Sequence, residues 1–231
     1  MGLRRVSIDE RRARLGARHG LAEGHHAADP VDAAHRVVAL HATDPASVYV
    51  STWARVHGVD PAQVSTALYD DRTLIRMLGM RRTMFVLPTQ LAPTVQHSST
   101  DAVAVRMRKA LVKDLSAVVE QPDAWLRSVE DSVVELLRER GEDTAVNLSN
   151  GEPRLRTTLS YAEGKKYGGT VNITSRVLNL ISAEGRIVRG RPGEKWNSSR
   201  YNWSPIEQWL PDGLPSIPAD EARVTLVRRW L

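Results

Sequence analysis

The sequence predicts a mainly α protein with small β-ribbons, in the α+β class, and two features of the chain indicate this. Helix-start signals recur in the first third, where Asp-Pro pairs stand at 29–30, 44–45 and 60–61. Segments with strand-forming residues follow helical patterns twice, at 74–88 and at 186–203. A helix, a tight turn and a two-stranded ribbon, in that order, predict tandem winged-helix domains.

Four short helices are predicted in the N-terminal region, near residues 7–19, 30–42, 45–56 and 61–71. The last three begin at the Asp-Pro pairs, because an Asp side chain at the N-cap accepts an unpaired backbone N–H and Pro suits the first helical position. The first helix is expected to open at Ser7, which has capping-box spacing to Glu10.

A ribbon is predicted to follow over residues 74–88. Gly79 interrupts its apolar pattern, and the Met84–Leu87 stretch favours a strand. We therefore expect a first winged-helix domain at residues 1–88. Its turn region carries three candidate DNA-binding residues: Arg76, Arg81 and Arg82.

Residues 89–141 are predicted to form a helical connector. Thr89 is expected to cap a helix that runs to about Leu115, with a break or kink near Pro93. A second helix is expected at 129–141, ending at Gly141. Its apolar residues share one stripe: Val129, Val133, Leu136 and Leu137.

Residues 142–211 are predicted to form a second winged-helix domain. Thr144 is expected to cap a short helix, and Asn150-Gly151 to form a turn. A further helix is expected over residues 171–183, because Val177, Leu178 and Ile181 have the spacing of a helix core. Glycines at 185, 190 and 193 frame expected strands around 186–189 and 200–203.

The C-terminal segment, residues 212–231, is predicted to hold a linker and the start of a third domain. The Pro-rich stretch 210–220 reads as the linker, and a new helix is expected from Ala219 or Asp220. The apolar face of that helix has nothing downstream to pack against, which predicts a truncated protein.

The composition excludes several classes of protein. The chain has no cysteine, which rules out disulfides and thiolate metal sites. It has no apolar run of the roughly 18 residues that a membrane-spanning helix needs, and its charged N-terminal segment lacks the apolar core of a signal peptide. The pair His25-His26 lacks metal-site spacing. We expect a cytoplasmic monomer without metal, cofactor or membrane contact.

A basic surplus is confined to one segment of the chain, residues 163–203. The segment holds eight basic and three acidic residues, so it carries the whole chain's net charge of +5. Such a surplus predicts a surface that docks a polyanion, and double-stranded DNA is the expected partner. The eight basic residues are candidate DNA contacts: Lys165, Lys166, Arg176, Arg186, Arg189, Arg191, Lys195 and Arg200.

Within this segment, Arg186, Arg189 and Arg191 are the strongest candidates for phosphate contacts. Arg189 and Arg191 are two residues apart, so in a strand they share a face. The alternative is a solvated hairpin whose Trp residues pack on the domain body. In both interpretations Trp203 and Trp209 are expected in the core.

Residues 41–44, His-Ala-Thr-Asp, stand at the junction of two predicted helices. His41 beside Asp44 has the chemistry of a general base that activates a water, which Thr43 would orient. The alternative is structural: Asp44 caps the next helix and His41 ends the previous one. Spacing alone favours the structural alternative.

Several segments together resemble the azinomycin-resistance family of DNA glycosylases: LHATDP (40–45), VYVSTWARV (48–56), LYDDRTLIRMLGMRRTMFVLP (68–88), GKKYGG (164–169) and YNWSPIEQWLP (201–211). The resemblance runs from about residue 5 to residue 231. It implies winged helices around a concave DNA-binding face, with a third winged helix and a β-barrel beyond this chain. It also implies excision of N7-alkylated purines, including those in interstrand crosslinks, without a metal.

The family's catalytic motif, Gln-x-Gln or Gln-x-Asp, aligns with His41 and Thr43, so neither family residue is present. An N7-alkylpurine is cationic and leaves readily, so the enzyme mainly positions water and stabilises positive charge on the sugar. His41 could accept a proton, Thr43 bind the water and Asp44 supply negative charge.

Three interpretations of function stay open on the sequence. The leading one is a DNA-binding member of this family engaged in alkylation repair, either as an active glycosylase or as an inactive relative. The second is a transcriptional regulator that reads bases with Thr174, Ser175, Arg176 and Asn179. The third is a non-functional gene fragment. The localisation expected with DNA binding is cytoplasmic and nucleoid-associated.

Overall fold

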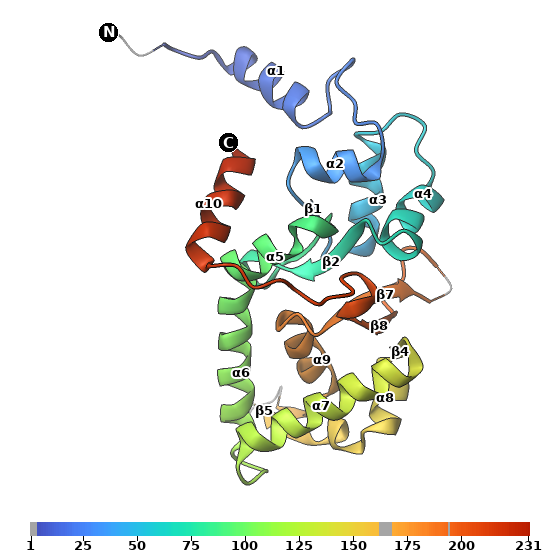
Figure 1. Ribbon diagram of the computed structural model, residues 1–231, viewed down its shortest axis with the longest axis vertical. Helices are drawn as coiled ribbons and strands as arrows, with labels where there is room; N and C mark the ends of the chain where they lie inside the picture. The colour runs from blue at the N-terminus through green and yellow to red at the C-terminus, as the bar shows by residue number, and fades with distance from the viewer. Residues whose placement is uncertain (1–3, 162–167, 194) are drawn as a thin grey trace.

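A computed structural model describes residues 4–161, 168–193 and 195–231 of the protein. Helices predominate, and the strands form three small antiparallel sheets (Figure 1). The predicted α+β class, mainly helical with small ribbons, is confirmed.

The N-terminal helices begin where the capping residues predict. They are α1 (Ile8–Arg18), α2 (Pro30–Arg36), α3 (Pro45–Trp53) and α4 (Pro61–Ser65), which continues as a π-helical turn (Thr66–Asp70). Asp29, Asp44 and Asp60 each accept a backbone N–H in the first turn of the helix that follows. Ser7 likewise caps α1 by accepting from the Glu10 N–H.

The predicted helix at 30–42 is wrong in its second half. Helix α2 ends at Arg36, and Val38 adopts a left-handed φ of 68°, which a continuing helix does not allow. The chain then forms strand β1 (Leu40–His41), which pairs with β3 (Met84–Pro88). His41 therefore lies in a strand opposite Phe85 instead of ending a helix.

Strands β2 (Leu74–Leu78) and β3 form the predicted ribbon, and β1 completes a sheet of order β1-β3-β2. The segment after it differs from the prediction, because Thr89 opens a 3-10 turn (Thr89–Leu91) and its hydroxyl donates to the Arg72 carbonyl. Helix α5 (Ala92–Val95), a π-helical turn (Gln96–Thr100) and α6 (Asp101–Leu115) follow in succession. The irregularity thus falls after Pro93, at residues 96–100.

The second half of the chain builds a second three-stranded sheet of order β4-β8-β7. Its strands are β4 (Asp143–Thr144), β7 (Ile187–Pro192) and β8 (Tyr201–Pro205), and the helices around it are α7 (Pro122–Arg140), α8 (Ala145–Gly151) and α9 (Thr174–Ala183). Thr144 caps α8 as predicted. Helix α7 begins earlier than the predicted residue 129, and Asn150-Gly151 closes α8 instead of forming a separate turn.

A third ribbon, absent from the prediction, lies between α8 and α9. A 3-10 turn (Pro153–Arg156) leads into β5 (Thr158–Tyr161), which pairs with β6 (Gly169–Asn172). Because residues 169–172 belong to this ribbon, α9 starts at Thr174 instead of near 171.

The two larger sheets belong to units that repeat one order of elements: helix, short strand, two helices, then two strands. The N-terminal unit comprises α2, β1, α3, α4 with its π turn, β2 and β3. The C-terminal unit comprises α7, β4, α8, α9, β7 and β8. In both, the first strand pairs with the third, and the units meet where β2 packs beside β7 (Figure 1).

Each unit has a core, but the N-terminal core draws on late parts of the chain. Val188, Ile206 and Trp209 pack in the cluster that includes Val48, Leu68 and Leu74. The Trp209 indole N–H lies 3.2 Å from the Leu68 carbonyl and 3.0 Å from that of Leu74. Trp203 lies in the second cluster, so both predicted core tryptophans are buried. The division into domains at 88, 141 and 211 remains a prediction.

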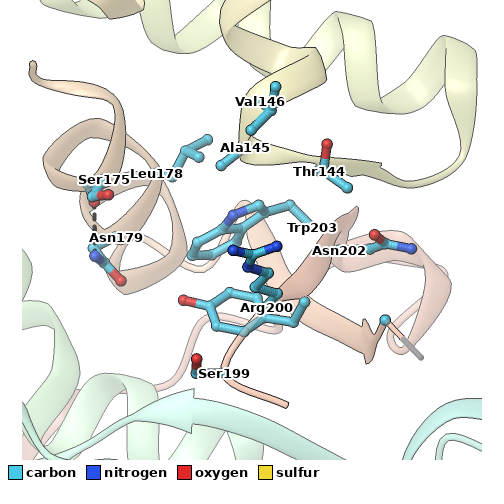
Figure 2. A pocket seen from close by; sticks show the side chains of 12 residues that line it. Thr144, Ala145, Val146, Ser175, Leu178, Asn179, Ser199, Arg200, Asn202 and Trp203 are labelled. Carbon is cyan, nitrogen blue, oxygen red and sulfur yellow. Dashed lines mark hydrogen bonds between the residues drawn. The ribbon is translucent and has the colours of Figure 1, made fainter. Parts of the chain in front are cut away.

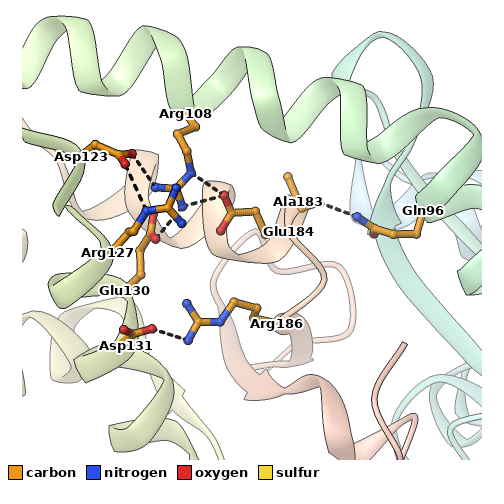
Figure 3. Close-up of polar contacts among 9 residues, drawn as sticks. All are labelled: Gln96, Arg108, Asp123, Arg127, Glu130, Asp131, Ala183, Glu184 and Arg186. Carbon is orange, nitrogen blue, oxygen red and sulfur yellow. Dashed lines mark hydrogen bonds and ion pairs between the residues drawn. The ribbon is translucent and has the colours of Figure 1, made fainter. Parts of the chain in front are cut away.

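An ion network joins α6, α7 and α9 around Arg108 (Figure 3). The guanidinium lies 2.6 Å from the Glu130 carboxylate, 2.7 Å from Glu184 and 3.3 Å from Asp123. Burial raises the pKa of Glu130, and Arg108 opposes that rise by stabilising the ionised form. The network therefore fixes the long helix α6 against the C-terminal unit.

Helix α10 (Ala219–Trp230) ends the chain and packs beside α5 (Figure 1). It begins where the sequence predicts. Among the residues that the structure describes, no helix combines the length and apolar character needed to span a membrane.

Candidate active site and nucleic-acid interface

The junction between β1 and α3 places His41, Thr43 and Asp44 on the protein surface, where all three are exposed. The His41 Nε2 lies 3.4 Å from the Thr43 hydroxyl, so the two side chains point toward one another. Asp44 accepts from the Ala46 N–H at 2.8 Å, which confirms its predicted capping role. The Ser47 hydroxyl lies 2.7 Å from the His41 carbonyl and 2.6 Å from that of Asp44, which ties both ends of the loop together.

The His41 and Phe85 rings form a T-shaped pair, at 6.0 Å between centroids and an angle of 84°. Phe85 is itself held by Gly79, where an added Cβ would stand 2.9 Å from the ring. Any larger residue at 79 would displace Phe85. The β2–β3 hairpin thus supports the position of His41.

The turn of this hairpin carries Arg81 and Arg82, and both residues are exposed. Their φ angles of 57° and 61° lie in the left-handed region, which glycine and asparagine adopt far more readily than arginine. Neither guanidinium has a hydrogen-bond or ion-pair partner among the described residues. Two strained positions are therefore occupied by solvent-facing cations.

The strand register brings the turn and the loop to the same end of the sheet. His41 pairs with Phe85, and the Ala42 N–H donates to the Met84 carbonyl at 2.9 Å. One step further along these antiparallel strands, β1 continues into Thr43 and β3 leads back to the turn at Arg82. The arrangement thus juxtaposes a polar loop with two unpaired positive charges.

Arg76 does not lie at this surface, and its predicted DNA contact is wrong. Its side chain projects from β2 at the seam between the units, and only 3% of the residue is exposed. A residue this buried cannot reach a phosphate without opening the fold. The sequence pattern missed this because β2 is enclosed only once the C-terminal unit packs beside it.

Arg189 is also turned inward, so the predicted phosphate contact does not fit its position. Its guanidinium stacks on the Tyr201 ring at 4.4 Å and donates to the Asn179 side chain at 2.9 Å. Burial lowers its pKa, and no carboxylate lies within ion-pairing distance among the described residues. Its role is packing between β7, β8 and α9.

Three other predicted cations are held by carboxylates. Ion pairs of 2.5–2.7 Å join Arg176 to Asp114, Arg186 to Asp131 and Arg191 to Asp70. The last of these links β7 to the N-terminal unit, where Arg191 also lies over the Tyr69 ring. The predicted pairing of Arg189 and Arg191 on one phosphate-binding face is therefore replaced by separate partners within the protein.

Lys195 and Arg200 are exposed in the β7–β8 connection. Neither forms an ion pair with a described residue. Lys165 and Lys166 lie outside the described residues. Of the eleven cations predicted to bind DNA, the structure thus leaves four open to solvent without an ion pair in its described part: Arg81, Arg82, Lys195 and Arg200.

A pocket of about 570 Å³ opens between α8, α9 and β8 of the C-terminal unit (Figure 2). Trp203 and Arg200 line it from β8 and the connection before it, and Ser175 and Asn179 from α9. The base-reading role predicted for α9 loses support here. Asn179 donates to the Ser175 carbonyl and accepts from Arg189, and Thr174 is buried and donates to the Leu155 carbonyl. The pocket was not predicted, because its walls come together only through tertiary packing.

No group of three or more His, Asp or Glu side chains within the described ranges has the arrangement of a metal site. The rings of His26 and His57 lie 3.8 Å apart between centroids at an angle of 55°, and no third such residue joins them within the described part of the chain.

Comparison with known proteins identifies the family. The family model described as "DNA glycosylase AlkZ-like" matches residues 34–231. The solved structure of Streptomyces sahachiroi DNA glycosylase AlkZ is similar in fold, with a TM-score of 0.62 and 16% sequence identity. The match covers 93% of this chain and 53% of that one, so the chain spans about half the length of AlkZ. No curated protein matches. Because the family model covers well over half of the chain, the protein belongs to the AlkZ-like DNA glycosylase family.

Proposed function

We propose that this protein binds double-stranded DNA through tandem winged helices and excises N7-alkylated purines, including those in interstrand crosslinks. The observation that carries the proposal is the exposed His41–Asp44 loop beside the two unpaired arginines of the β2–β3 turn. Membership of a DNA glycosylase family supports the same conclusion. We further propose that it acts as a cytoplasmic, nucleoid-associated monomer that needs neither metal nor cofactor.

The repeated order of elements supports the winged-helix assignment. In each unit the helix before the hairpin, α4 or α9, takes the place of the recognition helix, and the hairpin forms the wing. In the N-terminal unit the wing turn is Met80–Arg82, which carries two arginines without a hydrogen-bond or ion-pair partner among the described residues. Positively charged wings bind phosphates without reading sequence, as suits an enzyme that must search for damage anywhere in DNA.

The geometry of the loop suits hydrolysis of a glycosidic bond. A water that replaces the direct 3.4 Å contact and hydrogen-bonds to both the His41 Nε2 and the Thr43 hydroxyl would lose a proton to the imidazole as it attacks the sugar carbon, and the bond from that carbon to the base would break. Asp44 would place negative charge near the positive charge that develops on the sugar. The alkylated base leaves as a neutral purine, so no acid is required to protonate it.

Base release from duplex DNA containing N7-methylguanine tests the proposal, scored by alkali-induced strand cleavage, with binding to the same duplex measured in parallel. We expect release by the wild-type protein and a loss of about 100-fold in His41→Ala, the usual order for a general base. His25→Ala is the matched control, because the exposed His25 side chain lies outside the loop.

Each outcome has a distinct meaning. Release that His41→Ala leaves unchanged would refute the role of His41. Binding without release would make the chain a DNA-binding relative without glycosylase activity. Absence of both would overturn the proposal.

A further inference from the structure

Two tryptophans stand exposed on neighbouring surfaces of the two units. Trp53, the last residue of α3, is 70% exposed, and Trp196, from the β7–β8 connection, is 41% exposed. Val50, one helical turn before Trp53, is 60% exposed. Large apolar side chains gathered on a surface in this way mark a binding site more often than single ones do.

These side chains line one shallow groove. Its walls are Tyr49, Val50 and Trp53 of α3, Pro61 and Val64 of α4, and Trp196 of the opposite unit, around a volume of about 160 Å³. The Trp196 ring packs against Tyr49 at 4.4 Å between centroids, which fixes it in place. A cavity of about 150 Å³ holds a single benzene ring, so this groove has room for one flat ring system.

The charge next to Trp196 favours an anionic partner. Lys195 directly precedes Trp196 in the chain, and it is exposed and without an ion pair among the described residues. Asp60 is the acid in the groove wall, and its carboxylate caps α4 by accepting from the Ala62 N–H at 2.6 Å. The chain's net charge of +5 opposes the pairing of two copies across this face.

Helix α3 links the groove to the candidate active site. Asp44 caps its first turn and Trp53 is its last residue, which places them about 13 Å apart along the helix axis at 1.5 Å per residue. Ala46, Val50 and Trp53 follow one another at helical spacing on one side of α3, between the loop and the groove.

We propose that this groove holds one unstacked nucleobase of the bound DNA, with its ring between Trp53 and Trp196 and a flanking phosphate beside Lys195. Aromatic platforms bind unpaired bases in this way without selecting sequence. The inference rests on the proposed binding of DNA, and it adds that the DNA is locally unpaired when bound.

The test compares two duplexes of the same sequence, one fully paired and one with a single unpaired 2-aminopurine, in binding and in fluorescence. We expect the unpaired duplex to bind more tightly and its 2-aminopurine fluorescence to be quenched. Trp53→Ala is expected to weaken binding of the unpaired duplex about tenfold and to relieve the quenching, with less than about a twofold change for the paired duplex. Trp53→Phe keeps an aromatic ring, so it should retain most of the tighter binding and most of the quenching seen with the wild-type protein.

Two further variants separate an effect at the groove from misfolding and from a general loss of DNA binding. Val50→Glu places a negative charge in the groove at an exposed position, and we expect it to act like Trp53→Ala. Trp230→Ala removes an exposed tryptophan of α10 away from the groove and should change neither measurement. Thermal unfolding followed by circular dichroism verifies that each variant is folded.

Equal effects of Trp53→Ala on both duplexes, or no effect on either, would overturn the inference while leaving DNA binding intact. A wild-type protein that binds neither duplex would instead refute the proposed function. A concentration-dependent dimer that Trp53→Ala dissociates, seen by light scattering, would show that the groove holds a second copy and would also overturn the inference.

Discussion

The two units share one order of elements but use their charged residues in opposite ways. In the N-terminal unit, the junction between β1 and α3 and the turn of the hairpin leave His41, Arg81 and Arg82 exposed. In the C-terminal unit, the matching junction holds Asp143, which Arg140 binds at 2.7 Å, and the two arginines of strand β7 contact other residues of the protein: Arg191 pairs with Asp70 and Arg189 lies over the Tyr201 ring. The N-terminal unit thus leaves the charged residues of its junction and hairpin turn open to solvent, whereas the junction and strand β7 of the C-terminal unit use theirs for contacts within the protein.

This comparison teaches that a basic surplus in sequence does not by itself locate a polyanion-binding surface. In the segment with the largest surplus, residues 163–203, Arg176 and Arg191 pair with carboxylates on α6 and in the N-terminal unit, and Arg186 pairs with Asp131 inside the C-terminal unit. The turn at 81–82 adds only two charges, but both are free within the described part of the chain. An arginine can bind a polyanion only when its guanidinium is not already paired with a carboxylate or stacked on a ring inside the protein.

The largest expected effect concerns the ion network around Arg108. Arg108→Met would leave the buried Glu130 and the half-buried Glu184 without a cation, and we expect the free energy of unfolding to fall by about 3–5 kcal/mol. Urea denaturation measures this. Arg106→Met, on the same helix at an exposed position, is the control and should change stability by less than about 0.5 kcal/mol. Equal stability of the two variants would show that the network contributes nothing to cohesion.

A smaller effect is expected at Glu152, a second buried carboxylate of the C-terminal unit. Arg154 hydrogen-bonds its carboxylate and lowers the pKa to about 2 from a usual 4.5. Because the folded protein favours the ionised form, its stabilisation is present above pH 4.5 and is lost as the pH falls toward 2. Glu152→Gln should therefore cost about 2 kcal/mol at pH 7.

Urea denaturation of the wild-type protein and of Glu152→Gln across this pH range measures the free energy of unfolding of each. The difference between the two free energies should become smaller as the pH falls. Glu139→Gln, at an exposed position on α7, serves as the control and should show no such pH dependence. If the difference in unfolding free energy between the wild type and Glu152→Gln stayed constant with pH, the hydrogen bond to the ionised carboxylate could not be its cause.

The third prediction compares the DNA affinity of variants that lose unpaired arginines with that of variants that lose paired ones. Arg81→Asn with Arg82→Gly keeps the left-handed turn while removing both charges, so we expect duplex affinity to fall about tenfold and the slope of affinity against salt to fall by about two. Stability should rise slightly, because both new residues accept a positive φ. Arg176→Gln with Arg186→Gln removes two paired charges and should leave the salt slope unchanged.

Fluorescence anisotropy at several salt concentrations measures both double variants. A larger loss of affinity from the paired set would reverse the comparison and place the DNA on the C-terminal unit.

Local signals predicted the parts of the fold that depend on neighbouring residues. The N-caps at Asp29, Asp44, Asp60 and Thr144 were all predictable, because a cap involves only the next three residues. Strand β1 was not, since its two residues become a strand only by pairing with β3, more than forty positions later. A periodicity argument has no access to such a partner.

The candidate site was predictable in part for the same reason. The loop at 41–44 and the exposure of Arg81 and Arg82 follow from chain-local turns. Arg76 is buried where β2 meets β7, and Arg189 is enclosed between β7, β8 and α9, so charge alone predicted the wrong surroundings for both. The groove at Trp53 and Trp196 also joins distant segments, and the sequence showed only two separate tryptophans.

The position of Trp209 has a consequence for how this chain is made. Its indole binds carbonyls that precede it by 141 and 135 residues, and its ring completes the core of the N-terminal unit. During synthesis that unit emerges first, yet it lacks part of its interior until the ribosome has passed residue 209. Contacts of such long sequence separation slow folding and expose apolar surface meanwhile. Until residue 209 has been synthesised, the N-terminal unit therefore exposes apolar surface to which other chains and chaperones can bind.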